Sequence, residues 1–538
     1  MGVDRANGPD EARWMARLTW GFVGVGLALR LGLYLLDFPL WWDEVFVAVN
    51  LLRRGYLGLL RPLDYGQVAP LLFLWAELAS VRMLGFSEWS LRLVPLLAAL
   101  ASMPIFRSVA VRLLGGRAAL VAVAVFAVSV HPIRHAADLK PYSLDLLTAL
   151  VLQGLALCWW RRPDRPGRLL ALAAFGPIAL GFSHPAALAA GGIGLAIARP
   201  AWKTGRWDVR LAAGFYAFAV AATWVGLYQA FARSQAAAAS GAMREMWAAS
   251  FPPLGSAWGL ARWLAVVHSG DLMAYPCGGE GGASFLSLVA CLVGAWILVK
   301  AGRSTPLAIL VGPLVAGMAA AALGLYPYGG PAPHGSAARV MQYAAPGLCL
   351  LIGLGFSTGL DRLGTWIGPA RALRMAGVGL VLVGLAPLVE GARRPYRSFQ
   401  AEAARAFARR FWPEVGRGAE VACLRWDFDA AEWDSVRLGI AVSLCNQAIC
   451  SPSRRAGGPN WEAVSLERPL RCVLGVGGEA DSARVDAWLA TMAGRYRLAR
   501  REATDVNVAE PGRAPRLERY EVFEFVPRVE PGQAVNGS

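Results

Sequence analysis

Long apolar runs, separated by short polar gaps, dominate the chain before about residue 390. A helix needs about 20 predominantly apolar residues to cross the hydrocarbon core of a bilayer. The first run follows a polar stretch and carries no small-residue cleavage motif, so we expect it to remain as an uncleaved span. The twelve candidate spans lie near residues 15–37, 69–85, 90–113, 117–133, 142–160, 168–183, 185–199, 209–231, 284–300, 305–325, 338–358 and 370–388.

Basic residues concentrate in five of the gaps between the apolar runs. These gaps lie at residues 107–117, 161–168, 199–210, 300–303 and 361–374. Short loops rich in Arg and Lys are typical of the cytoplasmic side of a membrane protein. Because an even number of runs separates each gap from the next, all of them are predicted to face the cytoplasm together. We therefore expect a multipass protein of the cell (inner) membrane with a cytoplasmic N-terminus.

One apolar segment must stay on one side of the membrane if this orientation holds. Three runs separate the N-terminus from the basic gap at 107–117, and three crossings would place that gap outside. The segment at 69–85 is the weakest, because it is short and contains Pro70, Glu77 and Arg82. We expect it to be re-entrant or interfacial. About 11 transmembrane helices then remain, and the chain after residue 388 is predicted to be extracytoplasmic.

Shorter segments replace the long apolar runs in the last part of the chain. Strands are predicted at 420–428, 470–477 and 519–526, and helices at 398–412 and 480–498. This mixture predicts a small C-terminal α/β soluble domain at 393–538, which follows an all-α polytopic membrane domain at 1–392.

Composition supports a membrane protein. Hydrophobic residues make up 56% of the chain, charged residues 17%, and the mean hydropathy is +0.43. A net charge of +16 would indicate a nucleic-acid partner in a soluble protein, but these basic residues lie between spans, so no nucleic acid is expected. Four of the eight cysteines fall in the C-terminal domain, either as disulfides or as buried thiols, and their pairing is open: Cys423, Cys445, Cys450 and Cys472.

Two adjacent carboxylates, Asp43 and Glu44, follow the first run in the sequence PLWWDEVFVAVN. Carboxylates beside a membrane can act as a general base or bind a divalent metal ion. The alternative is that they are solvated charges next to an interfacial aromatic belt. No third ligand is evident from the spacing, so a divalent metal stays possible and no other cofactor is predicted.

Two further polar clusters are predicted to face the same side. The first, in RPLDYGQVAPLLFLW, contributes Tyr65 and Gln67 just before the segment that is not expected to cross. The second, in HPIRHAADLKPYSLDLL, precedes a span and extends into it at Asp145, and an ionisable residue inside a span is by default a functional candidate. An ordinary solvated loop is the alternative for each. The candidates of the second cluster are Arg134, Asp138, Lys140 and Tyr142.

Three weaker candidates lie elsewhere on this side. His184, in GFSHP between two runs, is either a site residue or a structural histidine. Arg339 and Tyr343 lie at the start of the run at 338–358. An arginine at the entrance to a span can bind a lipid phosphate through two parallel hydrogen bonds, or it can simply extend toward lipid headgroups.

The ordered set of these motifs resembles the integral-membrane glycosyltransferases of the GT-C fold. It is most similar to the bacterial branch of the protein mannosyltransferase and aminoarabinose transferase superfamily. The resemblance covers about residues 15–390 and implies a polyprenyl-phosphate sugar donor, a pocket at the outer membrane face and inversion at the anomeric carbon. The matching motifs are WWDE, DYGQVAPLLFLW, LGFSEWSLRLVPLLAAL, ADLKPYSLD and the turn with Arg339, Tyr343 and Pro346.

The resemblance also assigns roles to single residues. Asp43 falls on the family's base with Glu44 as its acidic neighbour, and Lys140 falls in the second pocket loop with Asp138 and Tyr142. Arg339 is then a phosphate contact. Many relatives carry His or a Glu-Lys pair where this chain has Gln67-Val68-Ala69-Pro70, so no particular sugar is predicted.

The acceptor is also open and can be a glycan, a lipid or a protein. Two other functions remain as alternatives, a transporter or flippase for a lipid or solute and a non-catalytic membrane scaffold. Transporters often have inverted repeats and broken midplane helices. The sequence has neither, and its ionisable residues collect at one face.

Overall fold

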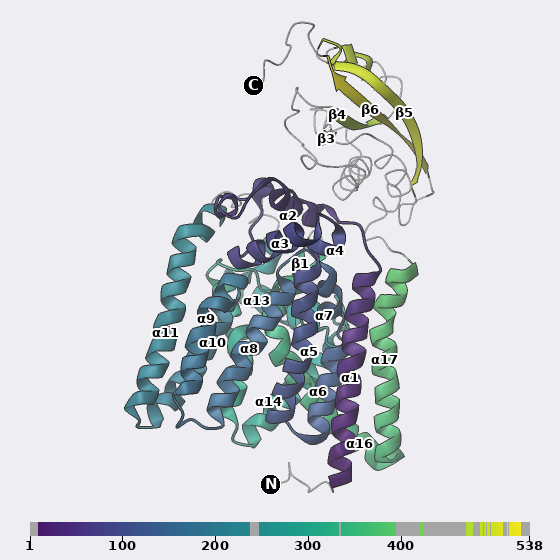
Figure 1. Cartoon of the computed structure of the whole chain (residues 1–538). Helices are drawn as coiled ribbons and strands as arrows, with labels where there is room; N and C mark the ends of the chain where they lie inside the picture. The colour runs from purple at the N-terminus through teal and green to yellow at the C-terminus, as the bar shows by residue number, and fades with distance from the viewer. Residues whose placement is uncertain are drawn as a thin grey trace. The chain divides into compact units, whose positions relative to one another are not determined.

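The computed structural model describes residues 9–236, 247–332 and 335–393, and parts of the C-terminal region (Figure 1). The described C-terminal parts are 420–423, 470–476, most of 485–508 and most of 514–528. The chain divides into two compact units. Unit 1 comprises Met1–Leu36, Tyr56–Ser80 and Arg92–Arg393, and unit 2 comprises Asp37–Gly55, Val81–Leu91 and Arg394–Ser538.

The long helices of unit 1 run side by side (Figure 1). They are α1 (Pro9–Leu35), α5 (Leu93–Leu113), α6 (Gly116–Val128), α8 (Tyr142–Trp160), α9 (Gly167–Phe182), α10 (Ala186–Lys203), α11 (Trp207–Leu227), α14 (Phe285–Lys300), α15 (Ser304–Ala322), α16 (Ala345–Ile367) and α17 (Pro369–Arg393). Shorter elements join them: η1 (Gly58–Leu60), η2 (Asp64–Gly66), α3 (Leu71–Leu84), α7 (Val130–Arg134), η3 (His135–Ala137), η4 (Tyr228–Ala232), η5 (Ala248–Ser250), α13 (Ala257–Ser269), η6 (Asp271–Met273), a hairpin of β1 (Pro331–Ala332) and β2 (Gly335–Ser336), and η7 (Ala337–Ala344).

Seven described helices are long and apolar enough to cross a membrane, namely α1, α5, α8, α11, α15, α16 and α17. The bent pair of α6 and α7 makes an eighth if it is one span, and α9 and α14 are shorter apolar helices. The predicted polytopic, all-α membrane domain is therefore confirmed. The expected non-crossing segment corresponds to α3, which has 14 residues and is not among the helices long enough to cross.

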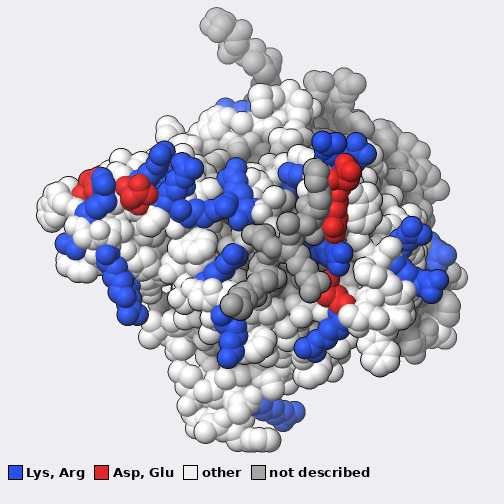
Figure 2. Space-filling view, turned by 90° about the horizontal axis from the view of Figure 1, so that it is seen from below, with Lys and Arg blue, Asp and Glu red and all other residues white. Residues whose placement is uncertain are grey.

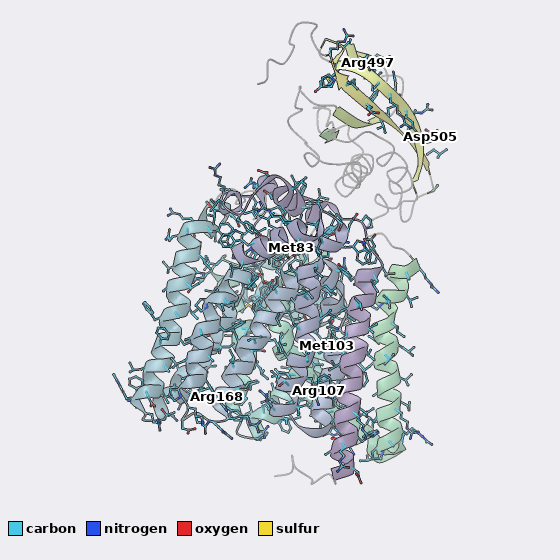
Figure 3. The ribbon with its side chains drawn as sticks, viewed as in Figure 1. Met83, Met103, Arg107, Arg168, Arg497 and Asp505 are labelled. Atoms are coloured by element: carbon cyan, nitrogen blue, oxygen red, sulfur yellow. The ribbon has the colours of Figure 1, made fainter. Side chains whose placement is uncertain are left out.

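One end of unit 1 collects the basic residues, and we call it the basic end. Figure 2 shows Lys and Arg spread over this face, with few Asp and Glu among them. Arg117 bridges the starts of α1 and α6 to α16 through ion pairs with Glu11 at 3.4 Å and Asp361 at 3.3 Å. Arg303 Nη1 donates to the carbonyl of Leu113 at 2.9 Å, which joins two of the short connections. Figure 3 labels Arg107 and Arg168 toward the same end.

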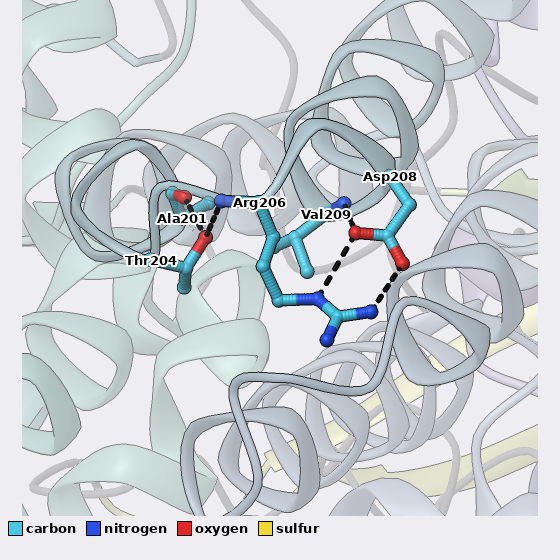
Figure 4. A network of polar contacts seen from close by, with 5 residues as sticks. All are labelled: Ala201, Thr204, Arg206, Asp208 and Val209. Atoms are coloured by element: carbon cyan, nitrogen blue, oxygen red, sulfur yellow. Dashed lines mark hydrogen bonds and ion pairs between the residues drawn. The ribbon is translucent and has the colours of Figure 1, made fainter.

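The turn between α10 and α11 shows how a basic connection is ordered locally (Figure 4). Thr204 Oγ1 donates to the carbonyl of Ala201 at 2.7 Å and accepts from the Arg206 amide at 3.3 Å. The Arg206 guanidinium binds both carboxylate oxygens of Asp208, at 3.1 and 2.7 Å. Asp208 also accepts from the Val209 amide at 3.0 Å, so a carboxylate occupies the helix start, where the macrodipole favours it.

A break between α6 and α7, bent by 48°, positions the polar segment that follows. Helix α6 ends at Val128, which leaves its last carbonyl groups without helical donors. Arg30, fully buried in α1, donates to the carbonyls of Ala127 at 3.0 Å and Phe126 at 3.3 Å. A buried guanidinium thus replaces the missing helical hydrogen bonds at the point where the chain turns.

Small residues allow the closest helix contacts in unit 1. A Cβ atom on Gly192 of α10 would collide with the backbone of Gly312 in α15. The same holds in reverse for Gly312. Close approach through small residues is the usual way in which helices associate within a bilayer, where no hydrophobic effect drives them together.

Unit 2 contains α2 (Trp42–Arg53), α4 (Glu88–Leu91) and a mixed sheet in the order β3-β4-β6-β5. Strand β3 is parallel to β4, whereas β4 and β5 are both antiparallel to β6. Val522 and Phe525 are buried, and Arg501 of β5 pairs with Glu521 of β6 at 2.9 Å. The four strands are β3 (Glu420–Cys423), β4 (Leu470–Val476), β5 (Tyr496–Val508) and β6 (Arg516–Pro527).

The sheet confirms the strands predicted at 470–477 and 519–526 and the first four residues of the strand predicted at 420–428, and it corrects one helix. The helix predicted at 480–498 is wrong at its end, because residues from Tyr496 onward form β5, a strand that the sequence analysis missed. Its alternation is hidden by charged residues such as Arg497 and Asp505, which Figure 3 labels on this strand. Pairing with β6 decides its conformation. The helix predicted at 398–412 and the side chains of the four C-terminal cysteines lie outside the described residues.

Candidate active site

The polar candidates of unit 1 gather at the end opposite the basic end, which we call the site end. Helix α8 runs between the two ends. Its last turn contacts the basic connections, since Arg112 Nη1 donates to Cys158 Sγ at 3.2 Å. Its first turn, beginning at Tyr142, therefore lies at the site end with the α6–α7 break.

A histidine–carboxylate pair orders the segment before α8. His135 Nδ1 lies 2.8 Å from Asp138 Oδ2, and both side chains are buried. Tyr142 packs edge-on against the His135 ring, with ring centroids 4.9 Å apart. Ser143 Oγ donates to the backbone carbonyl of His135 at 2.9 Å. The short η3 turn after α7 brings residues i and i+3 together, so this pair fixes the loop that carries Lys140.

Lys140 joins two of the polar clusters predicted from the sequence. Its Nζ donates to Gln67 Oε1 at 3.0 Å, although 73 residues separate the two in sequence. The Lys140 side chain is only 9% exposed, so its ammonium group is held in place rather than dispersed in solvent. A cation held in place in this way is suited to bind a phosphate group.

The segment after Gln67 is held by hydrogen bonds to two residues that are distant in the sequence, Gln235 and His184. The Ala69 amide donates to the buried Gln235 Oε1 at 3.2 Å, and His184 hydrogen-bonds to the Ala69 backbone. Burial lowers the pKa of His184 to about 4, against the opposing effect of that hydrogen bond, so the ring is neutral at pH 7. His184 Nε2 is buried and has no hydrogen-bond partner among the described residues.

Asp145, in the first turn of α8, is a second buried carboxylate near Asp138 in the sequence. It is 2% exposed and hydrogen-bonds to Ser183 in the α9–α10 turn. Burial, and then the nearby Asp145 carboxylate, raise the pKa of Tyr326 well above its ordinary value. Tyr326 therefore keeps its proton, and its hydroxyl donates to the carbonyl of Val340 at 3.0 Å.

Arg339 and Tyr343 lie on η7 with different environments. The Arg339 guanidinium lies over the Trp247 ring, 5.2 Å from its centroid. Tyr343 is fully buried, and its hydroxyl contacts Met341 Sδ at 3.4 Å and packs against Gly317, where a Cβ would collide with it. Tyr343 thus has a packing role in the structure, and its predicted contact with substrate stays a prediction.

Asp43 and Glu44 lie in unit 2, in the first turn of α2. Glu44 is fully buried and its Oε2 accepts from the Trp41 amide at 3.2 Å, so it caps the start of the helix. Asp43 is partly exposed beside it, at a helix start that favours a carboxylate. Glu44 therefore has a structural role in the fold, and the predicted role of Asp43 as a base stays a prediction.

Two other candidates predicted from the sequence are Arg134 and Tyr65. Arg134 is exposed at the end of α7. The side chain of Tyr65 lies outside the described part of the chain. Among the described residues no three or more His, Cys, Asp or Glu side chains form a group that could hold a metal ion. The convergence of Asp43 with Lys140 stays a prediction, because the two belong to different units.

Three polar contributors, two of them fully buried, were missed by the sequence analysis. Gln235, Ser183 and Tyr326 are each isolated in apolar or unremarkable surroundings in the sequence. The only available signal was that a polar residue near the end of an apolar run needs a hydrogen-bond partner once buried.

The helical architecture is that of a polytopic membrane protein, and comparison with solved structures confirms the GT-C fold. The chain is similar to the aminoarabinose transferase ArnT from Cupriavidus metallidurans bound to undecaprenyl phosphate, at a TM-score of 0.53 and 14% identity. That similarity covers 94% of this chain and 97% of ArnT. ArnT in the apo state is similar at a TM-score of 0.51, with the same identity and coverage.

The oligosaccharyltransferase of Archaeoglobus fulgidus is more distant, at a TM-score of 0.47 and 12% identity over 80% of this chain and 62% of that one. Comparison of sequences gives no matching family model and no significantly similar curated protein. At these identities the likeness shows the fold.

Proposed function

We propose that this protein transfers a sugar from a polyprenyl-phosphate carrier to an acceptor, with inversion at the anomeric carbon. The observation that carries the proposal is the hydrogen bond between Lys140 and Gln67, which unites two separate polar clusters around a buried cation. The fold shared with ArnT bound to undecaprenyl phosphate supports a lipid-phosphate donor.

The site end is then extracytoplasmic. Arg and Lys cover the opposite end of unit 1, and short basic loops favour the cytoplasm. This orientation gives a cytoplasmic N-terminus and an extracytoplasmic C-terminal domain in the inner membrane of the cell. The donor lies in the bilayer with its phosphate at the outer surface, and the acceptor, a glycan, lipid or protein, approaches from outside.

In the proposed reaction Asp43 accepts the proton of an acceptor hydroxyl while that oxygen attacks C1 of the sugar. The bond between C1 and the phosphate oxygen breaks, and polyprenyl phosphate leaves with its electron pair. Lys140 stabilises the growing charge on the phosphate, with Arg339 or Arg134 as a second cation. One preorganised donor of this kind is typically worth about 3 kcal/mol in the transition state.

The remaining buried groups hold this machinery in place. The His135–Asp138 pair fixes the loop that carries Lys140, and Gln67 orients its ammonium group. The neutral His184 supports the segment at Ala69, and its Nε2 can accept a hydrogen bond from a sugar hydroxyl.

The test is mass spectrometry of lipid-linked sugars and envelope glycans in cells that carry the wild type, no gene, or Asp43→Asn. We expect loss of one glycan and accumulation of one lipid-linked sugar both without the gene and in Asp43→Asn. The matched control is Asp208→Asn, the same change in an exposed carboxylate at the basic end, which should behave as wild type. Normal glycan in Asp43→Asn, with the protein present at normal level, would refute the assignment.

A further inference from the structure

A cleft lies on unit 1 between α5 and α8, which pack against each other. The two helices leave a cleft of about 420 Å³, within the range of about 300–1,000 Å³ that is usual for small-molecule sites. Its walls are mainly apolar, with Ile105, Val151 and Leu155 among the lining residues. Gly154 allows α8 to approach α5 closely, since a Cβ there would come within 3.1 Å of Val109 Cγ2.

Two arginines border the cleft. Arg112 ends α5, Arg161 follows α8, and both are exposed and line the cleft. In the described part of the chain neither forms an ion pair with a carboxylate, and the Arg112 guanidinium meets only the weak acceptor Cys158 Sγ at 3.2 Å. No Asp or Glu lines the cleft. Its mouth therefore favours an anion, and its body favours a hydrocarbon chain.

This cleft is separate from the candidate active site. It is lined by α8 residues from Val151 to Trp160, whereas the site uses the first turn of the same helix at Asp145. The 13 residues from Asp145 to Cys158 span about 20 Å at 1.5 Å per residue. A donor phosphate at Lys140 thus cannot also occupy the mouth of the cleft.

We propose that the cleft binds an anionic diacyl phospholipid from the leaflet at the basic end. One acyl chain lies between α5 and α8, and the headgroup phosphate accepts hydrogen bonds from Arg112 and Arg161. Basic pockets between transmembrane helices are suited to acidic lipid headgroups, and guanidinium groups bind phosphate oxygens in pairs. The site is independent of the transferase proposal, since it uses none of the same residues.

The test measures lipid retained by the full-length protein after extraction and exchange into nanodiscs. Phosphatidylcholine discs with and without phosphatidylglycerol are compared by native mass spectrometry and by the thermal unfolding midpoint. Wild type should retain phosphatidylglycerol and unfold at a higher temperature in its presence. Arg112→Gln and Arg161→Gln should each weaken retention about fivefold, which corresponds to about 1 kcal/mol per arginine.

Two further variants separate the cleft from general surface charge. Ser108→Phe fills the cleft from α5 and should abolish retention, whereas Leu97→Phe, at an exposed position two turns or more away on α5, should not. Arg165→Gln, on the same basic connection as Arg161 but outside the cleft, should also retain the lipid. Equal retention of phosphatidylcholine, equal loss in Arg165→Gln, or selective retention of polyprenyl phosphate instead would each overturn the proposal.

Discussion

Lys140→Met keeps the length of the side chain at the centre of the site but removes its charge. The lysine is 9% exposed and bonded to Gln67 at 3.0 Å, so its ammonium is preorganised for a phosphate. If the cation stabilises the leaving group, its loss should raise the barrier by about 3 kcal/mol and slow transfer roughly 10²-fold. Binding of the acceptor should change little, because that substrate does not contact the ammonium group in the proposed reaction.

Gln67→Leu tests whether the amide acts through Lys140. A hydrogen bond to a charged group contributes about 1.5–3 kcal/mol, so this variant should be about 10- to 100-fold slower. The double variant should be no slower than Lys140→Met alone, because Gln67 has nothing left to position. Gln229→Leu, the same change at an exposed position on η4, is the matched control and should leave the rate unchanged.

The assay uses the lipid-linked sugar that accumulates in cells without the gene as the donor, and initial rates of transfer by purified protein. The thermal unfolding midpoint of each variant reports whether folding is intact. Independent, additive effects of the two substitutions, near 10³- to 10⁴-fold together, would refute the positioning role of Gln67. A Lys140→Met enzyme with an unchanged rate would refute the role of the cation.

Three further predictions concern the framework of the site, each read from unfolding midpoints of purified protein. The pKa of His184 is lowered to about 4 in the folded state, so the unfolded chain binds a proton at this residue more tightly. The free energy of unfolding should therefore fall as the pH drops from 6.5 toward 4, and the loss should be about 2 kcal/mol at pH 5. His184→Gln should remove this decline, and an unchanged decline would contradict the assignment. Arg30→Leu removes the donors to the carbonyls of Phe126 and Ala127 and should lower the free energy of unfolding by about 3 kcal/mol. The control Arg371→Leu, at an exposed position on α17, should have little effect. Gly317→Ala should cost about 1–3 kcal/mol through its collision with the Tyr343 hydroxyl, and Tyr343→Phe should relieve much of that cost; equal loss in both backgrounds would rule out this contact.

Much of the fold could be predicted because a bilayer permits few solutions. A span must satisfy the hydrogen bonds of its own backbone, so it forms a helix, and the length of the apolar runs alone located most helices. The short, interrupted apolar run around Pro70 identified α3. The break after Val128 was not predicted. It depends on Arg30, almost a hundred residues earlier, which supplies the hydrogen bonds that the helix loses.

The candidate site was predictable where polar residues are dense and was missed where they are isolated. The segment from Arg134 to Tyr142 stood out by composition. Gln235 did not, because its partner, the Ala69 amide, is 166 residues away in the sequence. Strand β5 was missed for a related reason, since pairing with β6 outweighs its polar composition.

The most direct test of the central claim follows the fate of the lipid carrier during the reaction. Purified protein in vesicles is supplied with the accumulated lipid-linked sugar and its acceptor, and mass spectrometry and NMR follow both products. We predict that each transferred sugar releases one polyprenyl phosphate and has the inverted anomeric configuration, and that Asp43→Asn forms neither product. Movement of the intact lipid-linked sugar across the bilayer, with no carrier released, would contradict the account.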